Sequence, residues 1–505
     1  MATIPADEED PVIYDVAIIG AGPCGLAVAA RLREETPSAI FTDEEQRRYH
    51  WLKKYKGQMA IKNKKTLEVS SPSHAGGPGR GPSLLVLDKA GDSWLSKWNS
   101  QFTTFDISHL RSPMFFHIDP RDRDGLLGYT YRKGREAELL QIAGCVGQER
   151  TKNQRKKDRG RAGNWREQAI DERDRQDYYT PSRRLFRDHC EYVIEEYDLR
   201  KHLVKQEAVT DVDFGYVEGV SDMERVFTLT TSKNIWFAKT VVLSVGAGGE
   251  PEIPDSCGRC AVPGACHSMH IKTFPDPSVI VKHQNRKETS VVIVGGGLTA
   301  AHLAVNAIRS SVTKVHMIVR SHLKASFWSA DTDEERADQI LEARGGGSIT
   351  PRIHKIMKKL VCEGRLEIHT NTRIKSRRFD AQNSIWNYVY FATGIATDFR
   401  KIPLLQTLLQ KHPIDGVHGL PCLTEDMAWD SDVPLFATGK LASLRLGPGA
   451  ANLAGARVGA ERIAWAIQDC LGDDVQEEDM DAASDKYRYG IGSRYDSLGV
   501  GEDED

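Results

Sequence analysis

Residues 12–32, VIYDVAIIGAGPCGLAVAARL, decide the fold of this chain. The apolar run before the glycines predicts a buried strand, and the segment after them predicts a helix. Between the two stands the turn Gly20-Ala21-Gly22-Pro23-Cys24-Gly25, which has G-x-G-x-x-G spacing. In such a turn the first glycine allows the bend, the second lets a diphosphate approach the backbone, and the third lets the helix pack on the strand. The stretch therefore predicts a dinucleotide-binding unit.

The same layout returns in residues 290–308, SVVIVGGGLTAAHLAVNAI. Gly295 and Gly297 take the first two glycine positions, Thr299 follows, and Ala300 stands at the third. One glycine turn alone can simply be a loop between two elements, with no ligand bound. Two copies, each between an apolar strand and a helical pattern, favour two nucleotide sites in one chain.

The residue that ends the second strand of each unit handles the ribose of the nucleotide. In the first unit Asp88 closes the strand SLLVLD, and Asp43 is the alternative at the more usual spacing. Asp88 is preferred because its strand is long enough to lie in a sheet, and either carboxylate suits the unphosphorylated ribose of FAD. In the second unit Arg320 ends VTKVHMIVR, with Lys324 close behind. A cation there selects a 2′-phosphate, and hence NADPH over NADH, whereas the alternative is a surface arginine without a ligand.

Further segments predict strands that end where backbone passes close to a cofactor. They are VVLSVGAGGEPEIP at 241–254, YVYFATGIATD at 388–398 and PLFATGK at 434–440. Gly394 and Gly439 stand at the ends of the last two and are candidate cofactor contacts. A helix then follows a Pro-Gly turn, and Asn452 near its amino end would face the pyrimidine edge of a flavin. The alternative for Asn452 is simple helix capping.

The amino-acid composition limits the classes of protein and of binding partner that the chain can have. The 505 residues are 40 % hydrophobic and 28 % charged, which is typical of a globular protein, and the formal net charge is only −3. Such a balance indicates neither a nucleic-acid partner nor an anionic membrane partner. No apolar run reaches the roughly 18 residues of a membrane span, and the acidic start is unlike a secretory signal. Nine cysteines, an odd number without framework spacing, favour a reducing, cytoplasmic location.

These observations predict an α/β fold with two doubly wound, Rossmann-like domains, the NADPH domain being inserted into a discontinuous FAD domain. The expected parts are an FAD-binding part at 10–284, an NADPH-binding domain at 285–387, a second FAD-binding part at 388–472 and an acidic, disordered tail at 473–505. The first part contains a highly charged insertion at about 149–176, which is too poor in apolar residues to bury a core.

Seven segments together resemble the two-dinucleotide-domain flavoprotein monooxygenases, especially the ornithine and lysine N-hydroxylases, and are also similar to the oxidative-stress-induced growth inhibitor proteins. They are GAGPCG, DKAGDSW, SHLRSPMFF, YYTPSRRLFRDHCEYVIEEY, VVIVGGGLTAAHLA, FATG and ANLAGARVGAERI. The resemblance implies that NADPH reduces FAD, that the reduced flavin and O2 form a C4a-hydroperoxide, and that the distal oxygen passes to a small nucleophilic substrate, most often in N-hydroxylation. It adds Trp94 to the cofactor-binding candidates.

The chain departs from this family at several positions. Where the ornithine enzymes have a lysine that helps to hold the substrate carboxylate, this chain has Phe105, which argues against ornithine. Ile395 replaces the tyrosine of FATGY, and Lys440 replaces the common aspartate of the last motif. His267-Ser268 resembles the end of the FxGxxxHS fingerprint, but Gly264 stands one residue too close. No catalytic acid or base is identified.

Three competing interpretations remain. Cys257 and Cys260 form a C-x-x-C pair, which beside a flavin would make a disulfide reductase. With Cys266 and His267 they would also supply zinc ligands, although the spacing matches no usual set, so no metal site is predicted. The third is a regulatory flavoprotein that binds both coenzymes without turning over a substrate. The expected partners are a small-molecule substrate and O2, and the sequence leaves a homo-oligomer open.

Overall fold

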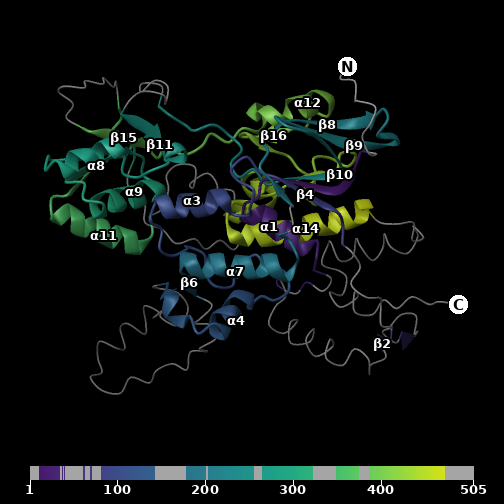
Figure 1. Cartoon of the computed structure of the whole chain (residues 1–505), viewed down its shortest axis with the longest axis horizontal. Coiled ribbons are helices and arrows are strands. Elements are labelled where there is room, and N and C mark those ends of the chain that lie inside the picture. Colours follow the sequence, from purple (N-terminus) through teal and green to yellow (C-terminus); the bar gives the residue numbers. More distant parts are fainter. Residues whose placement is uncertain are drawn as a thin grey trace, which may run out of the picture.

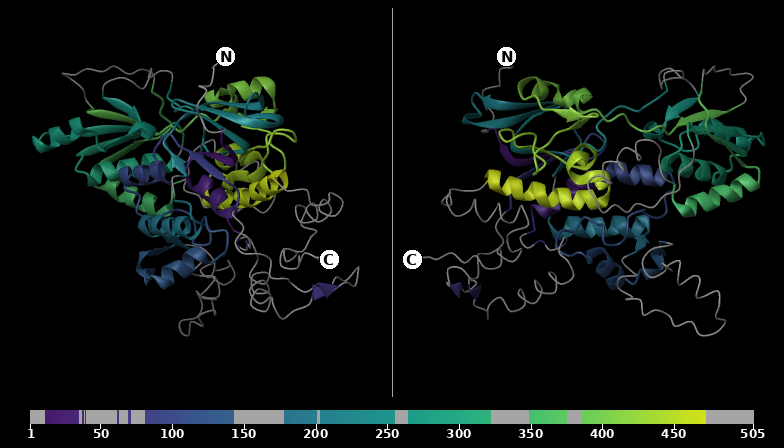
Figure 2. Two further views of the ribbon diagram at one scale, coloured as in Figure 1. Left: turned by 45° about the vertical axis from the view of Figure 1, so that its right-hand side comes forward. Right: turned by 180° about the vertical axis from the view of Figure 1, so that it is seen from behind.

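The computed structural model describes two units that lie side by side (Figure 1). The described residues are 11–34, 37, 39, 61–62, 69–70, 81–142, 178–200, 203–254, 264–321, 349–374 and 386–471. The first unit contains β4 (Leu84–Leu87), β10 (Ile235–Leu243), α1 (Pro23–Arg31) and α14 (Leu453–Leu471). The second contains β11 (Ala265–His267), β15 (Tyr388–Phe391), α8 (Pro277–Gln284), α9 (Leu298–Arg309) and α11 (Pro351–Cys362). Views from two further directions show the same division (Figure 2).

The first unit is built on a seven-stranded sheet. Its strands are β1 (Ile13–Ile19), β4 (Leu84–Leu87), β7 (Val204–Lys205), β8 (Val209–Val217), β9 (Ser221–Thr231), β10 (Ile235–Leu243) and β18 (Leu435–Ala437). The order is β7-β4-β1-β10-β9-β8, and β18 pairs with β10. Strand β1 is parallel to both neighbours, with Val16 beside Leu84 and Thr240. The first half of β10 pairs antiparallel with β9, and the second half is parallel to β18.

Helix α14 (Leu453–Leu471) packs on β10 of this sheet and α12 (Gln406–Lys411) packs on β8. The unit also contains α1 (Pro23–Arg31), α3 (Ser96–Thr104), α4 (Gly125–Arg132), α7 (Arg183–Glu196) and α13 (Ser443–Leu446). Helix α1 packs against α14 and also touches α7. The start of α7 is fixed by Ser182, whose hydroxyl accepts a hydrogen bond from the amide of Leu185 at 3.0 Å. Central residues such as Val16, Ile18 and Leu26 are fully buried.

The second unit is a five-stranded parallel sheet. Its strands are β11 (Ala265–His267), β12 (Ser290–Val294), β13 (Lys314–Ile318), β14 (Leu366–His369) and β15 (Tyr388–Phe391), in the order β11-β15-β12-β13-β14. Helices α8 (Pro277–Gln284), α9 (Leu298–Arg309) and α11 (Pro351–Cys362) belong to this unit. Helix α9 contacts β12 and β13, while α11 contacts α9 and β14. The α/β class with two Rossmann-like units is therefore confirmed.

Two features differ from the sequence prediction. Strand β15, expected to open the second FAD-binding part at residue 388, pairs with β12 inside the second sheet, and β11, expected in the first part, pairs with β15. The reason is that strand pairing depends on contacts between residues far apart in the sequence, and a short apolar run carries no local signal of its partner strand. The β8–β9 hairpin also extends the first sheet with antiparallel strands, which the sequence reading did not specify.

Smaller elements complete the described part. Three two-stranded antiparallel ladders join β2 (Ile61–Lys62) to β3 (Val69–Ser70), β5 (Leu139–Gln141) to β6 (Tyr179–Pro181), and β16 (Gly416–Val417) to β17 (Leu420–Pro421). Among the described residues, no helix combines the length and apolarity that crossing a bilayer requires.

Candidate coenzyme sites

The first glycine turn joins β1 to α1 at the carboxyl end of the parallel strands. A Cβ at Gly20, whose φ is +110°, would lie 2.4 Å from the carbonyl oxygen of Ser244, and one at Gly25 would lie 2.3 Å from the carbonyl oxygen of Gly20. Both contacts are with backbone, so these positions must lack side chains. A Cβ at Gly22 would meet nothing within 4 Å. Gly22 also precedes α1 without a side-chain cap, and Pro23 opens the helix, so its amino end is left open.

Asp88 lies beside this turn. It follows β4, the strand paired with β1, and its two carboxylate oxygens accept hydrogen bonds from the amides of Ala21 at 2.7 Å and Ala90 at 2.6 Å. The carboxylate therefore holds the turn in place while each oxygen keeps a further acceptor position. The alternative, Asp43, lies outside the described residues.

Two strand ends from distant parts of the chain complete the first site. Ser244 follows β10, and its buried hydroxyl has no hydrogen-bond partner among the described residues. Thr438 and Gly439 follow β18, where a Cβ on Gly439 would lie 3.5 Å from the sulfur of Cys24. Burial raises the pKa of the Cys24 thiol to about 11, and the nearby Thr438 hydroxyl offsets part of that rise. Cys24 is consequently a neutral thiol near pH 7.

Helix α14 begins directly after Asn452, which is exposed. A Cβ at Gly459 would lie 3.2 Å from the Thr438 hydroxyl, so α14 packs closely on the end of β18. Asn452 is seven residues, or about two turns, from Gly459 and shares its face of the helix. The structure thus gathers most candidates of the first unit at one edge of the sheet: Gly20, Gly22, Pro23, Cys24, Gly25, Asp88 and Gly439. Asn452 directly precedes α14, the helix that packs on this edge through Gly459.

Trp94 takes a different position from the others. Its ring is 5 % exposed within the core, and its indole nitrogen donates to the carbonyl oxygen of Leu199 at 3.0 Å. This arrangement anchors the segment after Asp88 to the chain beyond α7. A core role thus accounts for Trp94 without a cofactor.

The second glycine turn repeats the geometry between β12 and α9. Gly295 has φ +142°, and a Cβ there would lie 2.3 Å from the carbonyl oxygen of Ala392. Gly297 precedes α9 without a side-chain cap. In the first turns of α9, Ala300 is fully buried, whereas Thr299 is exposed. Ala300 is therefore small for packing, as the third position of the motif requires.

Arg320 and Gly394 flank this second turn. Arg320 is exposed two residues beyond β13, the strand parallel to β12, and Lys324 lies outside the described residues. Gly394 has φ +93° and follows β15, so it belongs to the edge of the second sheet, although the sequence reading grouped it with the flavin strands. The buried ring of His267, at the end of β11, lies against the backbone of Gly394, and its burial lowers the pKa of the imidazole.

Within the described ranges of the chain, two connections join the units. Pro251 and Ile395 form an antiparallel bridge, and the amide of Glu252 donates to the carbonyl oxygen of Gly394 at 3.0 Å. The residues after α3 form the other connection, because Phe105 is buried in the apolar cluster of the second unit. The side-chain amide of Asn306 on α9 donates to the carbonyl oxygen of Thr104 at 3.1 Å.

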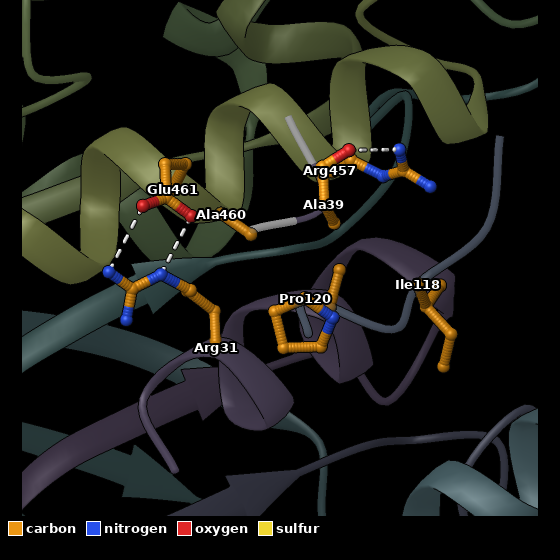
Figure 3. A pocket seen from close by; sticks show the side chains of 8 residues that line it. Arg31, Ala39, Ile118, Pro120, Arg457, Ala460 and Glu461 are labelled. Carbon is orange, nitrogen blue, oxygen red and sulfur yellow. Dashed lines mark hydrogen bonds and ion pairs between the residues drawn. The ribbon is translucent and has the colours of Figure 1, made fainter. Parts of the chain in front are cut away.

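A small pocket lies farther along α1, between this helix and α14 (Figure 3). The guanidinium of Arg31 pairs with both carboxylate oxygens of Glu461, at 2.7 and 3.0 Å. Arg457 is also buried and donates to the carbonyl oxygen of Ala39 at 2.9 Å. Since Arg31 ends α1 and the glycine turn begins it, this pocket is separate from the first coenzyme site.

Sequence reasoning did not single out Ser244 or Thr438 as individual residues. The available signal was their position at the ends of strands already suspected of approaching a cofactor, VVLSVG and PLFATG. Cys257 and Cys260, the candidate dithiol, lie outside the described residues.

Comparison with known proteins supports the resemblance. Residues 174–333 match the model of the family described as L-lysine 6-monooxygenase/L-ornithine 5-monooxygenase. No curated protein matches the chain. The structure is similar to an ornithine N-hydroxylase from Kutzneria sp. 744, with 14 % identity, TM-score 0.56 and coverage of 91 % of this chain and 100 % of that one. It is also similar to L-lysine 6-monooxygenase from Pseudomonas syringae, with 16 % identity, TM-score 0.54 and the same coverage.

A cadaverine monooxygenase from Erwinia amylovora, solved with FAD, gives 13 % identity and a TM-score of 0.56. The alignment covers 91 % of this chain and 95 % of that one. At these identities the likeness establishes the shared fold alone, over about nine tenths of this chain.

Proposed function

We propose that this protein is an FAD- and NADPH-dependent monooxygenase that oxygenates a small nucleophilic substrate, with N-hydroxylation of an amine as its reaction. The observation that carries the proposal is the presence of two glycine turns at the carboxyl edges of two parallel sheets in one chain. The family match over residues 174–333 and the shared fold support the choice of monooxygenase.

The first site fits the diphosphate of FAD. Gly22 leaves space beside the open amino end of α1, whose amides and dipole favour an anion. Asp88 has acceptor positions left for ribose hydroxyls after binding Ala21 and Ala90. The unpartnered hydroxyl of Ser244 supplies a further polar group at the same edge.

The second site fits NADPH, with Gly297 before α9 and the exposed Arg320 beyond β13 for the 2′-phosphate. When bound, FAD would supply the chemistry of accepting a hydride from NADPH and activating O2 for transfer. The chain itself contributes binding, orientation and exclusion of water. Its neutral Cys24 thiol would place no thiolate next to the coenzyme.

The residue type at position 105, phenylalanine, indicates which class of substrate the protein accepts. The position where the ornithine enzymes are expected to have a lysine is occupied by a ring that is 8 % exposed and packed in the second unit. It therefore cannot hold a carboxylate there. We propose an amine substrate whose recognition does not depend on a carboxylate bound at this position.

The test is aerobic turnover of the purified holoprotein. We expect a yellow protein with one FAD per chain, NADPH oxidation that increases with the correct amine, and a hydroxylamine product. Amines without a carboxylate should be oxidised faster than ornithine. A protein that takes up no FAD, or that oxidises NADPH without oxygenating any amine or sulfide, would contradict the proposal.

The same assay separates the alternatives. Rapid reduction of a disulfide dye that is lost in Cys257→Ser would favour the disulfide reductase. Coenzyme binding without any turnover would favour a regulator.

For the location of the protein we propose a reducing, cytoplasmic compartment, on the evidence of the cysteine pattern. Size-exclusion chromatography of the holoprotein will decide whether a homo-oligomer forms.

A further inference from the structure

Two histidines and a glutamate gather on one face of the second sheet. His316 lies on β13, and Glu367 and His369 lie two residues apart on the adjacent strand β14. The parallel register sets His316 beside Glu367, and Ile318 beside His369. Because side chains alternate between faces along a strand, this register directs all three polar groups to the same side.

The distances among their donor atoms are those of a metal site. Nδ1 of His316 lies 3.4 Å from Nε2 of His369 and 3.5 Å from a carboxylate oxygen of Glu367. Nε2 of His369 lies 3.5 Å from the other oxygen of Glu367. Ligands about 2.0–2.2 Å from a tetrahedral zinc ion are about 3.3–3.6 Å from one another. The separations of 3.4 and 3.5 Å fall within this range, with the two histidines facing different oxygens of the same carboxylate.

We propose that His316, Glu367 and His369 bind one divalent ion of the zinc type, with the fourth position open to water. Two imidazoles and one carboxylate form a ligand set that zinc accepts. The side chains of Glu367 and His369 are 46 % and 38 % exposed, so an ion can reach them from solvent. This inference is independent of the proposed function, since it uses neither glycine turn.

A neighbouring indole and a competing cation lie beside the two imidazoles. The imidazoles of His316 and His369 are stacked at 13°, and the ring of Trp386 lies 6.3 Å from His316. The ammonium of Lys314, on the same strand as His316, lies 2.9 Å from an oxygen of Glu367. The ammonium repels an incoming cation and occupies one oxygen of Glu367, so Lys314 should weaken metal binding.

Zinc alone is the probe for the test. Holoprotein with alkylated cysteines, which removes thiol sites such as Cys362 and Cys470, is equilibrated with ZnCl2 by dialysis, and bound zinc is measured by atomic emission. We expect one equivalent in the wild type. The affinity should fall at least tenfold in His316→Gln/His369→Gln and rise severalfold in Lys314→Met.

Two further variants keep the test decisive. Glu367→Gln alters an exposed side chain, so it should lose zinc affinity while the protein stays folded. His283→Gln on α8 removes an exposed histidine elsewhere and should leave binding unchanged. Equal zinc binding by the wild type and by the double histidine variant would overturn the proposal, as would weaker binding in Lys314→Met.

Discussion

At the scale of single residues, substitutions at the glycines of the first turn distinguish effects on folding from effects on coenzyme binding. Gly22→Ala places a methyl group in space that is empty within 4 Å, and its φ of −81° suits alanine. The fold should therefore be unaffected, while the new methyl group occupies the approach of the diphosphate. We expect the Kd for FAD to rise at least about tenfold, which is a loss of about 1.4 kcal/mol. Fluorescence titration of the apoprotein measures it.

The controls for this prediction are two other glycines. Gly128→Ala on α4 also meets nothing within 4 Å and should leave FAD affinity as it is. Gly25→Ala drives a methyl group into backbone and should lower the melting temperature of the apoprotein itself. An unchanged Kd for Gly22→Ala would show that FAD does not approach this turn.

Arg320 gives a second prediction at this scale. Its exposed position beyond β13 suits a 2′-phosphate, and a hydrogen bond to a charged group contributes about 1.5–3 kcal/mol. Arg320→Ala should therefore raise the KM for NADPH about 10- to 100-fold and leave the KM for NADH nearly unchanged. Steady-state NAD(P)H oxidation with both coenzymes provides the comparison, and an equal loss with both would exclude Arg320 as the selector.

At the scale of elements, α1 and α14 are joined by a buried ion pair (Figure 3). The side chains of Arg31 and Glu461 are only 3 % and 10 % exposed. Removing one partner leaves a buried charge uncompensated, which costs about 3–5 kcal/mol. We expect Glu461→Ala to lower the free energy of unfolding by this amount in urea titration, and Arg31→Met/Glu461→Leu to recover much of it.

A surface pair serves as the control for that experiment. Arg445 and Glu425 are close, but Glu425 is 67 % exposed, so Glu425→Ala should change the stability by less than about 1 kcal/mol. If Glu425→Ala and Glu461→Ala proved equally destabilising, burial of the α1–α14 pair would not be the cause.

The same scale shows what sequence could predict. The strand–turn–helix units around Gly20 and Gly295 were predictable because their signals are local: an apolar run, glycine spacing and a helical pattern. The preference for Asp88 followed from strand length, and β4 indeed lies beside β1. The placement of β15 in the second sheet was missed because a four-residue apolar strand has no local mark of its partner.

At the scale of the whole molecule, the relations between distant segments were beyond sequence reasoning. Thr438 reaches Cys24, and His316 reaches His369, only because the sheets bring separate strands together. Phe105 was recognised as a departure from the ornithine enzymes, yet its position in the apolar cluster of the second unit depends on how the two units pack. Sequence thus predicted the two glycine turns better than the way in which the two units pack together.

That arrangement leads to a prediction about electron transfer. Phe105 and the Asn306–Thr104 hydrogen bond couple α3 of the first unit to α9 of the second. Phe105→Ala removes about 3–5 kcal/mol of packing from this contact, and misplacing reacting groups by 1 Å can cost about 100-fold in rate. We expect flavin reduction at saturating NADPH to slow at least about tenfold in anaerobic stopped-flow, with FAD content unchanged. Arg309→Ala, which breaks only the exposed pair with Asp106, should change the rate less than about twofold. A normal reduction rate in Phe105→Ala would mean that the contact at Phe105 does not set the relative position of the two coenzymes.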